Sequence, residues 1–203
     1  MKIIPRDNLP DFSLPLPIFT SVHIADAISR DGDEFDLFVG LDKKYADQLR
    51  ELSSDENDAN LQNFTGDRRR FVEKTYEHWY KKNRTPFALI HKQSDALAAI
   101  IWFGPKPLGK KSIKFSGTEE GKMESDWHTI SFRSYPNFRG KGMMKNFAKF
   151  VIDFYKRYFI NIKFWTGTDD RNNAFTKLIT DLGFETDEKT SDLAEHWLIM
   201  TKM

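Results

Sequence analysis

The feature that most constrains the fold of this chain is a pair of glycines between a predicted strand and a predicted helix. Apolar and polar residues alternate over residues 127–133, which indicates a strand with one buried face. From residue 143 to 158, apolar residues recur every three or four positions, which indicates an amphipathic helix. Gly140 and Gly142 lie in the short connection. The sequence therefore predicts a strand, a tight turn and a helix in that order.

This junction has the properties of an anion site. Without a Cβ atom in the way, consecutive N–H groups of the turn can point at one bound group. The start of the helix adds its positive dipole end, and Arg139 and Lys141 add formal charge. A phosphate or pyrophosphate is the expected ligand. The alternative is that the glycines only shape a turn and that the basic side chains are solvated.

The other elements follow from periodicity and turn residues. Strands are expected at residues 34–41, 87–91, 96–103, 162–166 and 196–200, and helices at residues 43–52, 67–82 and 172–182. Asp67 is the expected N-cap of the second of these helices. Residues 1–33 are expected to form an extended arm, separate from a domain of residues 34–203. Strands that alternate with helices predict an α/β or α+β fold.

Composition excludes several classes of protein. The 203 residues suit one domain, and the absence of cysteine excludes disulfides, thiolate metal sites and thiol nucleophiles. The longest apolar stretch, residues 96–103, is far shorter than the roughly 20 residues that cross a bilayer. A net charge of +1 argues against binding of nucleic acid by bulk charge. We expect a soluble cytoplasmic protein with no metal, no nucleic-acid partner and no membrane partner.

Two ordered motifs resemble those of the GCN5-related N-acetyltransferases (GNAT). Residues 139–143, Arg-Gly-Lys-Gly-Met, match the glycine motif that follows the central strand of that family, although Asn137 stands where Gln or Arg is usual. Residues 172–175, Asn-Asn-Ala-Phe, and residues 182–184, Leu-Gly-Phe, resemble the family's second motif, a helix that begins after an Asn and ends in Leu-Gly-Phe. One helix and one strand separate the motifs, as in the family. The resemblance covers residues 87–200 well and residues 34–86 loosely.

The resemblance implies a GNAT-like twisted mixed sheet flanked by helices, with a central strand, glycine loop and helix that bind acetyl-CoA. The loop would hold the pyrophosphate, and the pantetheine arm would insert where the strands before and after the central helix splay apart. The cofactor contacts implied are Phe132, Arg133, Ser134, Arg139, Gly140, Lys141, Gly142, Met143, Met144, Asn172 and Phe175.

The activity implied is transfer of the acetyl group from the thioester to a primary amine of a small molecule or peptide, by direct attack. Asp126 and His128, at the start of the strand, are the candidate catalytic bases, with a purely structural role or a water relay as alternatives. Many family members place a Tyr acid on the second-motif helix, where this chain has Ile179. That departure keeps open a non-catalytic acyl-CoA sensor with the same fold. The oligomeric state, monomer or homodimer, is left open.

Charge is distributed unevenly along the chain. Residues 26–60 have a net charge of −7, and residues 131–165 have a net charge of +7. An acidic segment is usually solvated surface, but in the resembling fold it borders the acceptor site, where it would attract a cationic amine. Neutralising Asp55, Glu56 and Asp58 would then raise KM for a cationic acceptor without changing the affinity for acetyl-CoA.

A rival motif is Gly-x-x-x-x-Gly-Lys at residues 104–110, which matches a nucleotide-binding P-loop. Lys111 replaces the Ser or Thr that would hold Mg²⁺, and the residues that follow suggest a strand rather than a helix. A kinase or NTPase is therefore the weaker alternative. His78 and His91 have no second ligand at metal spacing, so no zinc site is expected.

Overall fold

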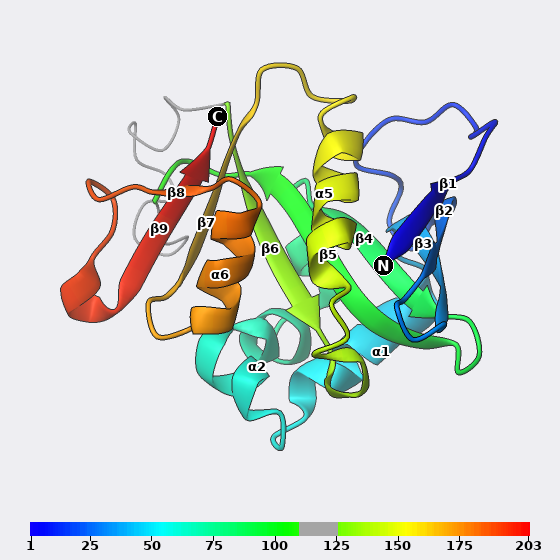
Figure 1. Cartoon of the computed structure of the whole chain (residues 1–203), viewed down its shortest axis with the longest axis horizontal. Helices are drawn as coiled ribbons and strands as arrows, with labels where there is room; N and C mark the ends of the chain where they lie inside the picture. The colour runs from blue at the N-terminus through cyan, green and yellow to red at the C-terminus, as the bar shows by residue number, and fades with distance from the viewer. Residues whose placement is uncertain (110–125) are drawn as a thin grey trace.

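A computed structural model describes residues 1–109 and 126–203. Its centre is one mixed sheet with the strand order β1-β2-β3-β4-β5-β6-β7-β9-β8 (Figure 1). Among these strands only β6 and β7 pair in parallel. The strands are β1 (Lys2–Pro5), β2 (Ser21–Ile28), β3 (Glu34–Gly40), β4 (Thr85–His91), β5 (Ala96–Pro105), β6 (Trp127–Ser134), β7 (Lys163–Asp169), β8 (Glu185–Thr186) and β9 (Trp197–Lys202). This architecture confirms the predicted mixed sheet flanked by helices.

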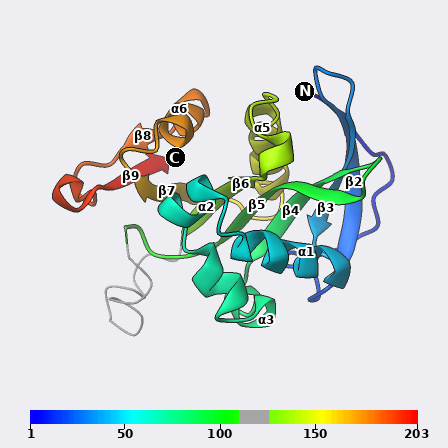
Figure 2. The same ribbon diagram turned by 90° about the horizontal axis from the view of Figure 1, so that it is seen from below.

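Helices cover both faces of the sheet. Figure 2 shows α5 (Met144–Tyr155) and α6 (Asn173–Asp181) on one side, and α1 (Lys43–Ser54), α2 (Ala59–Phe64) and α3 (Tyr76–Tyr80) on the other. We call these the α5 face and the α1 face. α5 forms because its apolar residues recur at helical spacing and are buried against β5 and β6. Within the part of the chain that the structure describes, no helix is long and apolar enough to span a bilayer.

Each face has its own hydrophobic core. On the α5 face, Phe147 and Val151 of α5 pack with Ile130 and Phe132 of β6. On the α1 face, Trp102 of β5 meets aromatic residues of the helices, with Trp79 edge-on at 5.5 Å between ring centroids. The alternation of side chains along β5 and β6 thus assigns each residue to one face.

The parallel strands β6 and β7 pair over a short length and separate beyond it. The candidate site lies where they separate. The two strands pair at three positions only, ending with Thr129 opposite Trp165. β6 continues to Ser134 and β7 to Asp169 without further pairing to each other. The strands on either side of α5 therefore splay apart, as the sequence resemblance predicted. We call this opening the β6–β7 gap and the Thr129–Trp165 pair its foot.

Three sequence predictions differ from the structure. The expected N-terminal arm contributes β1 and β2, which pair with each other and with β3, so residues 2–5 and 21–28 are part of the sheet. Residues 53–63, where no helix or strand was expected, contain most of α2. The expected helix at residues 67–82 is split into a π-helical turn, Arg68–Val72, and α3, and Asp67 does not cap it, because its carboxylate is buried in ion pairs.

Candidate functional site

The backbone of β6 presents hydrogen-bonding groups to the β6–β7 gap. Tyr135 donates its N–H to Ala98 O at 3.1 Å, which turns the backbone groups of the odd-numbered β6 residues toward β5. The even-numbered residues therefore turn theirs toward β7. Beyond Thr129 there is no β7 partner for them, so the backbone N–H groups of Phe132 and Ser134 face the gap. The gap can accept an extended ligand that pairs as an added strand would.

The segment Arg139-Gly140-Lys141-Gly142-Met143, here called the glycine loop, closes one end of the gap. Gly140 and Gly142 adopt left-handed φ values of 76° and 67°, which side chains with a Cβ rarely tolerate. A Cβ atom added to either would meet nothing within 4 Å, so both face open space. Among the described residues, none accepts a hydrogen bond from the N–H groups of Gly140, Lys141 or Gly142. With the N-terminus of α5 beside them, these groups form a concave donor surface suited to an anion.

Arg139 does not project its charge freely from the glycine loop. Its Nη1 and Nη2 atoms donate to the two carboxylate oxygens of Asp58 at 2.7 and 2.5 Å, and its Nε donates to Ser134 O at 2.7 Å. Asp58 also caps α2 by accepting the N–H of Leu61. Burial alone would raise the pKa of Asp58, but the hydrogen bond from Arg139 and those from the backbone outweigh it, so the net pKa is lowered. Arg139 thus ties the loop to β6 and α2.

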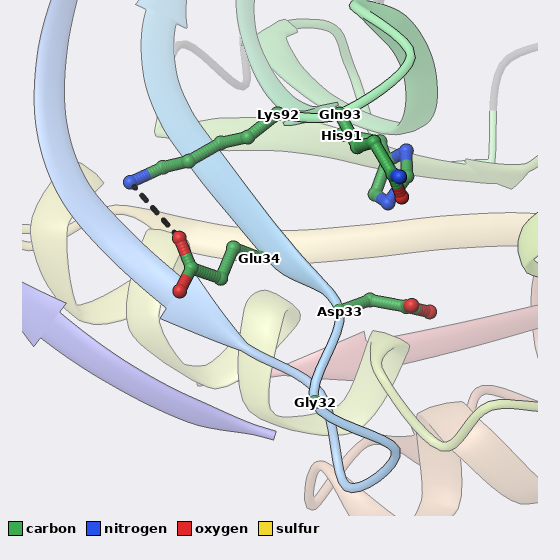
Figure 3. A pocket seen from close by; sticks show the side chains of 6 residues that line it. All are labelled: Gly32, Asp33, Glu34, His91, Lys92 and Gln93. Atoms are coloured by element: carbon green, nitrogen blue, oxygen red, sulfur yellow. Dashed lines mark ion pairs between the residues drawn. The ribbon is translucent and has the colours of Figure 1, made fainter.

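Lys141 is paired as well, at the edge of a pocket. Its Nζ donates to Asp33 at 2.7 Å, and this hydrogen bond is the main reason that the pKa of Asp33 is lowered. Asp33 also lines a cavity of about 410 Å³ between the β2–β3 and β4–β5 turns, with His91 and Lys92 among its other walls (Figure 3). The pocket therefore adjoins the glycine loop through the Asp33 side chain.

Arg133, a predicted cofactor contact, belongs to the opposite face. Its guanidinium makes two hydrogen bonds to Asp67, with Nη2 at 2.8 Å from one carboxylate oxygen, and lies 4.8 Å from the centroid of the Trp102 ring. As an odd-numbered residue of β6, it turns its backbone groups toward β5. Its Nη1 also donates to Phe132 O at 2.6 Å, and its contact with the cofactor stays a prediction. The sequence could not show the pair with Asp67, because Asp67 lies 66 positions away.

The second motif lines the other edge of the gap. Asn172 caps α6 by accepting the N–H of Phe175 at 3.2 Å, and the Phe175 ring lies edge-on to Phe132 at 5.6 Å. Met143, the last residue of the glycine loop, is buried, and Met144 is the first residue of α5. Ile179 is fully buried and cannot supply a proton. The structure thus brings the two motifs together across the gap, as the sequence predicted.

Of the candidate bases, His128 lies on the α5 face. It is buried, and its Nδ1 is 2.8 Å from the Tyr155 hydroxyl. Burial, followed by the charge of Arg84, lowers the pKa of His128 to about 4 despite the opposing charge of Asp126. The imidazole is therefore neutral at neutral pH and is hydrogen-bonded to the Tyr155 hydroxyl, and its catalytic role stays a prediction. Asp126 is exposed at the start of β6, and its catalytic role stays a prediction.

The acidic segment does not form the free border that was expected. Asp58 and Asp33 pair with the two cations of the glycine loop, and Glu56 pairs with Arg68 at 2.7 Å. The expectation that Asp58 attracts a cationic acceptor is wrong, because its side chain is 2% exposed and holds Arg139.

The P-loop alternative has no support in the described part of its motif. Gly104 and Pro105 are residues of β5, and a Cβ on Gly104 would meet Arg84 at 2.5 Å, so this glycine makes room for a side chain rather than for a phosphate. Lys110 and Lys111, with the residues that follow up to 125, lie outside the described residues.

Two clusters offer ligand types suited to a metal, His23 with Asp26 and Asp36, and Asp169 with Asp170 and His196. In the first, Lys92 already lies 2.7 Å from Asp26 and 3.4 Å from Asp36. In the second, Asp169 pairs with Arg171, and this hydrogen bond is the main reason that its pKa is lowered to about 2. A side-chain cation thus pairs with at least one carboxylate of each cluster.

The chain was compared with protein families, with curated protein sequences and with solved structures, and only the solved structures match. No protein-family model matches the chain. No curated protein sequence matches it either. Among solved structures, the GNAT domain of S. lividans PAT aligns with a TM-score of 0.59 and 14% identity, covering 87% of this chain and 94% of that one. RimL, a ribosomal L7/L12 alpha-N-protein acetyltransferase solved with coenzyme A, aligns with a TM-score of 0.59 and 14% identity over 82% of this chain and 93% of that one.

The ribosomal-protein-S5-alanine acetyltransferase from Vibrio fischeri gives a TM-score of 0.53 and 15% identity over 82% of this chain and 92% of that one. At these identities the likeness is one of fold, and it confirms the fold that the two motifs predicted.

Proposed function

We propose that this chain, which has the GNAT fold, is an acetyl-CoA-dependent N-acetyltransferase that acts on a primary amine. The observation that carries the proposal is the conjunction of the β6–β7 gap with the glycine loop at its end. In RimL, a chain of similar fold is solved with coenzyme A. Acetyl-CoA supplies an activated acetyl thioester, and the remaining steps concern what this chain's residues contribute.

The glycine loop fits a pyrophosphate. The N–H groups of Gly140, Lys141 and Gly142 have no acceptor among the described residues, and the space that their Cβ atoms would fill is open. These donors and the N-terminus of α5 would bind the phosphates. Arg139 acts by positioning the loop through Asp58 and Ser134, and Lys141 contributes charge once its pair with Asp33 loosens.

β6 fits the amides of an extended arm. The carbonyl oxygens of Phe132 and Ser134 already accept hydrogen bonds from Arg133 and Arg139, at 2.6 and 2.7 Å. Their N–H groups remain for a ligand in the gap, and Phe175 and Asn172 of the second motif would border it on the other side.

The chemistry is attack of an amine nitrogen on the thioester carbon, with loss of the amine proton and departure of the sulfur with the bonding electron pair. A backbone N–H at the gap would stabilise the oxyanion that develops on the carbonyl oxygen. His128 is neutral but bound to Tyr155, so the proton would leave through water or through Asp126. The thiolate would depart without a side-chain acid from α6, because Ile179 occupies that position.

Ile179 is also the observation that favours a second candidate, a protein that binds acyl-CoA without transferring the acyl group. Both candidates require the same cofactor site, and they differ only in turnover.

The test is acetyl-CoA-dependent release of free thiol with a panel of primary amines. Because the chain contains no cysteine, a thiol-reactive chromophore reports only released CoA. We expect release with at least one amine and none with the Gly142→Glu variant. Binding of CoA without release for any amine would support the sensor, and absence of CoA binding would reject both candidates.

A further inference from the structure

A row of four residues crosses the sheet at the foot of the β6–β7 gap. Thr85 pairs with Phe103, which places Arg84, just before β4, beside Gly104. Gly104 pairs with Thr129, and Thr129 pairs with Trp165. Adjacent strands lie about 4.8 Å apart, so the row connects Arg84 with the foot of the gap over three strand spacings. Figure 1 shows that β4, β5, β6 and β7 are neighbours in this order.

The row faces the α1 side of the sheet. Trp102, two residues before Gly104, belongs to the core on that side. Arg84 lies flat on Gly104, where an added Cβ would be 2.5 Å from its Nη1 and 2.8 Å from its Cδ. Only a glycine at this position allows the guanidinium to extend along the sheet toward β6.

Arg84 has hydrogen-bond donors without acceptors. Its Nε and Nη1 atoms are shielded from solvent, and among residues 1–109 and 126–203 no acceptor lies within hydrogen-bond distance of them. A buried donor without an acceptor costs about 1–3 kcal/mol. Such atoms in a native fold call for an explanation, and a ligand that supplies oxygen acceptors is one.

Lys106, two residues after Gly104, brings a second cation beside this row. Its Nζ lies 4.7 Å from the centroid of the Trp165 ring, and its carbonyl accepts the indole N–H of Trp165 at 2.8 Å. Lys106 is thus held over the residue at the foot of the gap. Burial, followed by the charges of Arg84, Arg70 and Lys82, lowers the pKa of Lys106 to about 7.

The charged side chains that lower the pKa values of Arg84 and Lys106 are all cations. Of the groups that act on Lys106 or Arg84, Arg70 is bound to Asp67 at 2.6 Å, and the other Asp67 oxygen is bound to Arg133. No described carboxylate pairs with Arg84 or Lys106. Lys82 and Arg70 add like charge. An anion bound here would relieve the mutual repulsion of these cations.

We infer that Arg84 and Lys106 bind a carboxylate of the acceptor amine, on the α1 face at the foot of the β6–β7 gap. This inference rests on the proposed function, and it reverses the sign of the acceptor that the acidic segment suggested. The fork of the guanidinium suits the two oxygens of a carboxylate, and the Lys106 ammonium supplies a single further donor. An amino acid or another amine that carries a carboxylate is the acceptor class that fits.

The first experiment needs no knowledge of the acceptor and no turnover. The pKa of the Lys106 amine is measured by NMR of lysine labelled at the side chain, in sodium acetate and in acetamide at matched ionic strength. Acetate is expected to raise this pKa by about one pH unit, because a carboxylate next to an ammonium favours its charged form. Acetamide has the same shape without charge and is expected to leave it unchanged.

Variants separate the site from general ionic effects. Arg84→Gln is expected to abolish the response to acetate, whereas Lys156→Met, which removes a lysine that lies over Phe164 on the other side of the sheet, is expected to retain it. If Arg84→Gln does not fold, Lys106→Met serves instead, with loss of the acetate-dependent rise in Tm as the readout. An equal response to acetate and acetamide, or no response, would overturn the inference.

The second experiment compares glycine with glycinamide as acceptors. The wild type is expected to favour the carboxylate by at least about tenfold in kcat/KM, and Lys106→Met to lose this preference. Binding of CoA, measured in parallel, distinguishes failure of this inference from failure of the proposed function. CoA binding without an effect of acetate rejects the inference alone, and absence of CoA binding rejects the proposed function alone.

Discussion

The cations of the glycine loop and those at the foot of the β6–β7 gap differ in what neutralises them. Arg139 and Lys141 each have a carboxylate partner within 2.7 Å, supplied by the acidic N-terminal segment. Arg84 and Lys106 have none among the described residues, although two nitrogen atoms of Arg84 are shielded from solvent. The loop therefore offers backbone dipoles with little net side-chain charge, whereas the foot of the gap offers side-chain charge. Each suits an anion for a different physical reason.

The largest expected effect concerns a cation that is both buried and paired. Asp67→Asn removes the carboxylate that holds Arg133 and Arg70, and leaves a buried guanidinium without its counter-charge. We expect a loss of about 4 kcal/mol in the free energy of unfolding, measured with urea. Glu56→Gln is the control, because the Glu56 side chain is 73% exposed in its pair with Arg68. A loss as small as that of the control would mean that burial does not determine how much an ion pair contributes to the free energy of unfolding.

Lys106→Met tests the opposite case, a partly buried cation with no carboxylate partner among residues 1–109 and 126–203. The folded chain releases the Lys106 proton near pH 7, whereas the unfolded chain keeps it to about pH 10.5. The unfolded state therefore binds more protons in this window, and wild-type stability rises with pH across it. We expect the variant to be more stable by about 3 kcal/mol at pH 7, with the difference vanishing near pH 10.5. Urea unfolding at both pH values measures this, and a difference independent of pH would refute it.

His128→Gln tests whether protonation of the His128 side chain contributes to stability or to catalysis. The folded pKa near 4 lies below the ordinary histidine value of 6.5, so the wild type loses stability as the pH falls between these values. The variant is expected to lack this loss, worth about 2 kcal/mol at pH 4.5, and to keep its kcat within about threefold at neutral pH. Unfolding curves from pH 4 to 7 and the thiol-release assay measure the two parts. A large fall in kcat at unchanged stability would identify His128 as a catalytic residue.

Asp33→Asn is expected to have the smallest effect. It frees Lys141 beside the glycine loop without disturbing the backbone of the loop, because the pair lies at the surface. CoA should then bind about threefold more tightly at low salt, and the gain should shrink at high salt as charges are screened. Asp58→Asn should instead weaken binding, since Asp58 positions the loop through Arg139 and caps α2. The same sign for both variants would show that the two pairs do not differ in role.

Sequence alone predicted the parts of the site that depend on local spacing. The glycine loop, α5 and the start of α6 near Asn172 follow from turn residues and helical periodicity within short segments. The partners of the charged residues could not be predicted, because Asp58 meets Arg139 across 81 positions and Asp67 meets Arg133 across 66. Arg84 and Lys106 were missed for the same reason, since only the register of four strands brings Arg84 into one row with Trp165, over which Lys106 lies.

The edge of the sheet was also missed. β1 is short and follows no alternating pattern in an N-terminal region with several prolines, so residues 1–33 suggested an arm rather than strands. Pairing with β2 and β3 determines its structure, and that pairing is non-local.

The most direct test of the account is calorimetric titration of CoA into the wild type, Gly142→Glu and Gly183→Glu. Gly142 and Gly183 both have left-handed backbones, with φ of 67° and 79°, so the two variants carry similar backbone strain. Only the first places a carboxylate in the open space of the glycine loop. We predict micromolar binding by the wild type and Gly183→Glu, and a loss of at least about 100-fold in Gly142→Glu. Absence of binding by the folded wild type, or equal binding by all three proteins, would contradict the account.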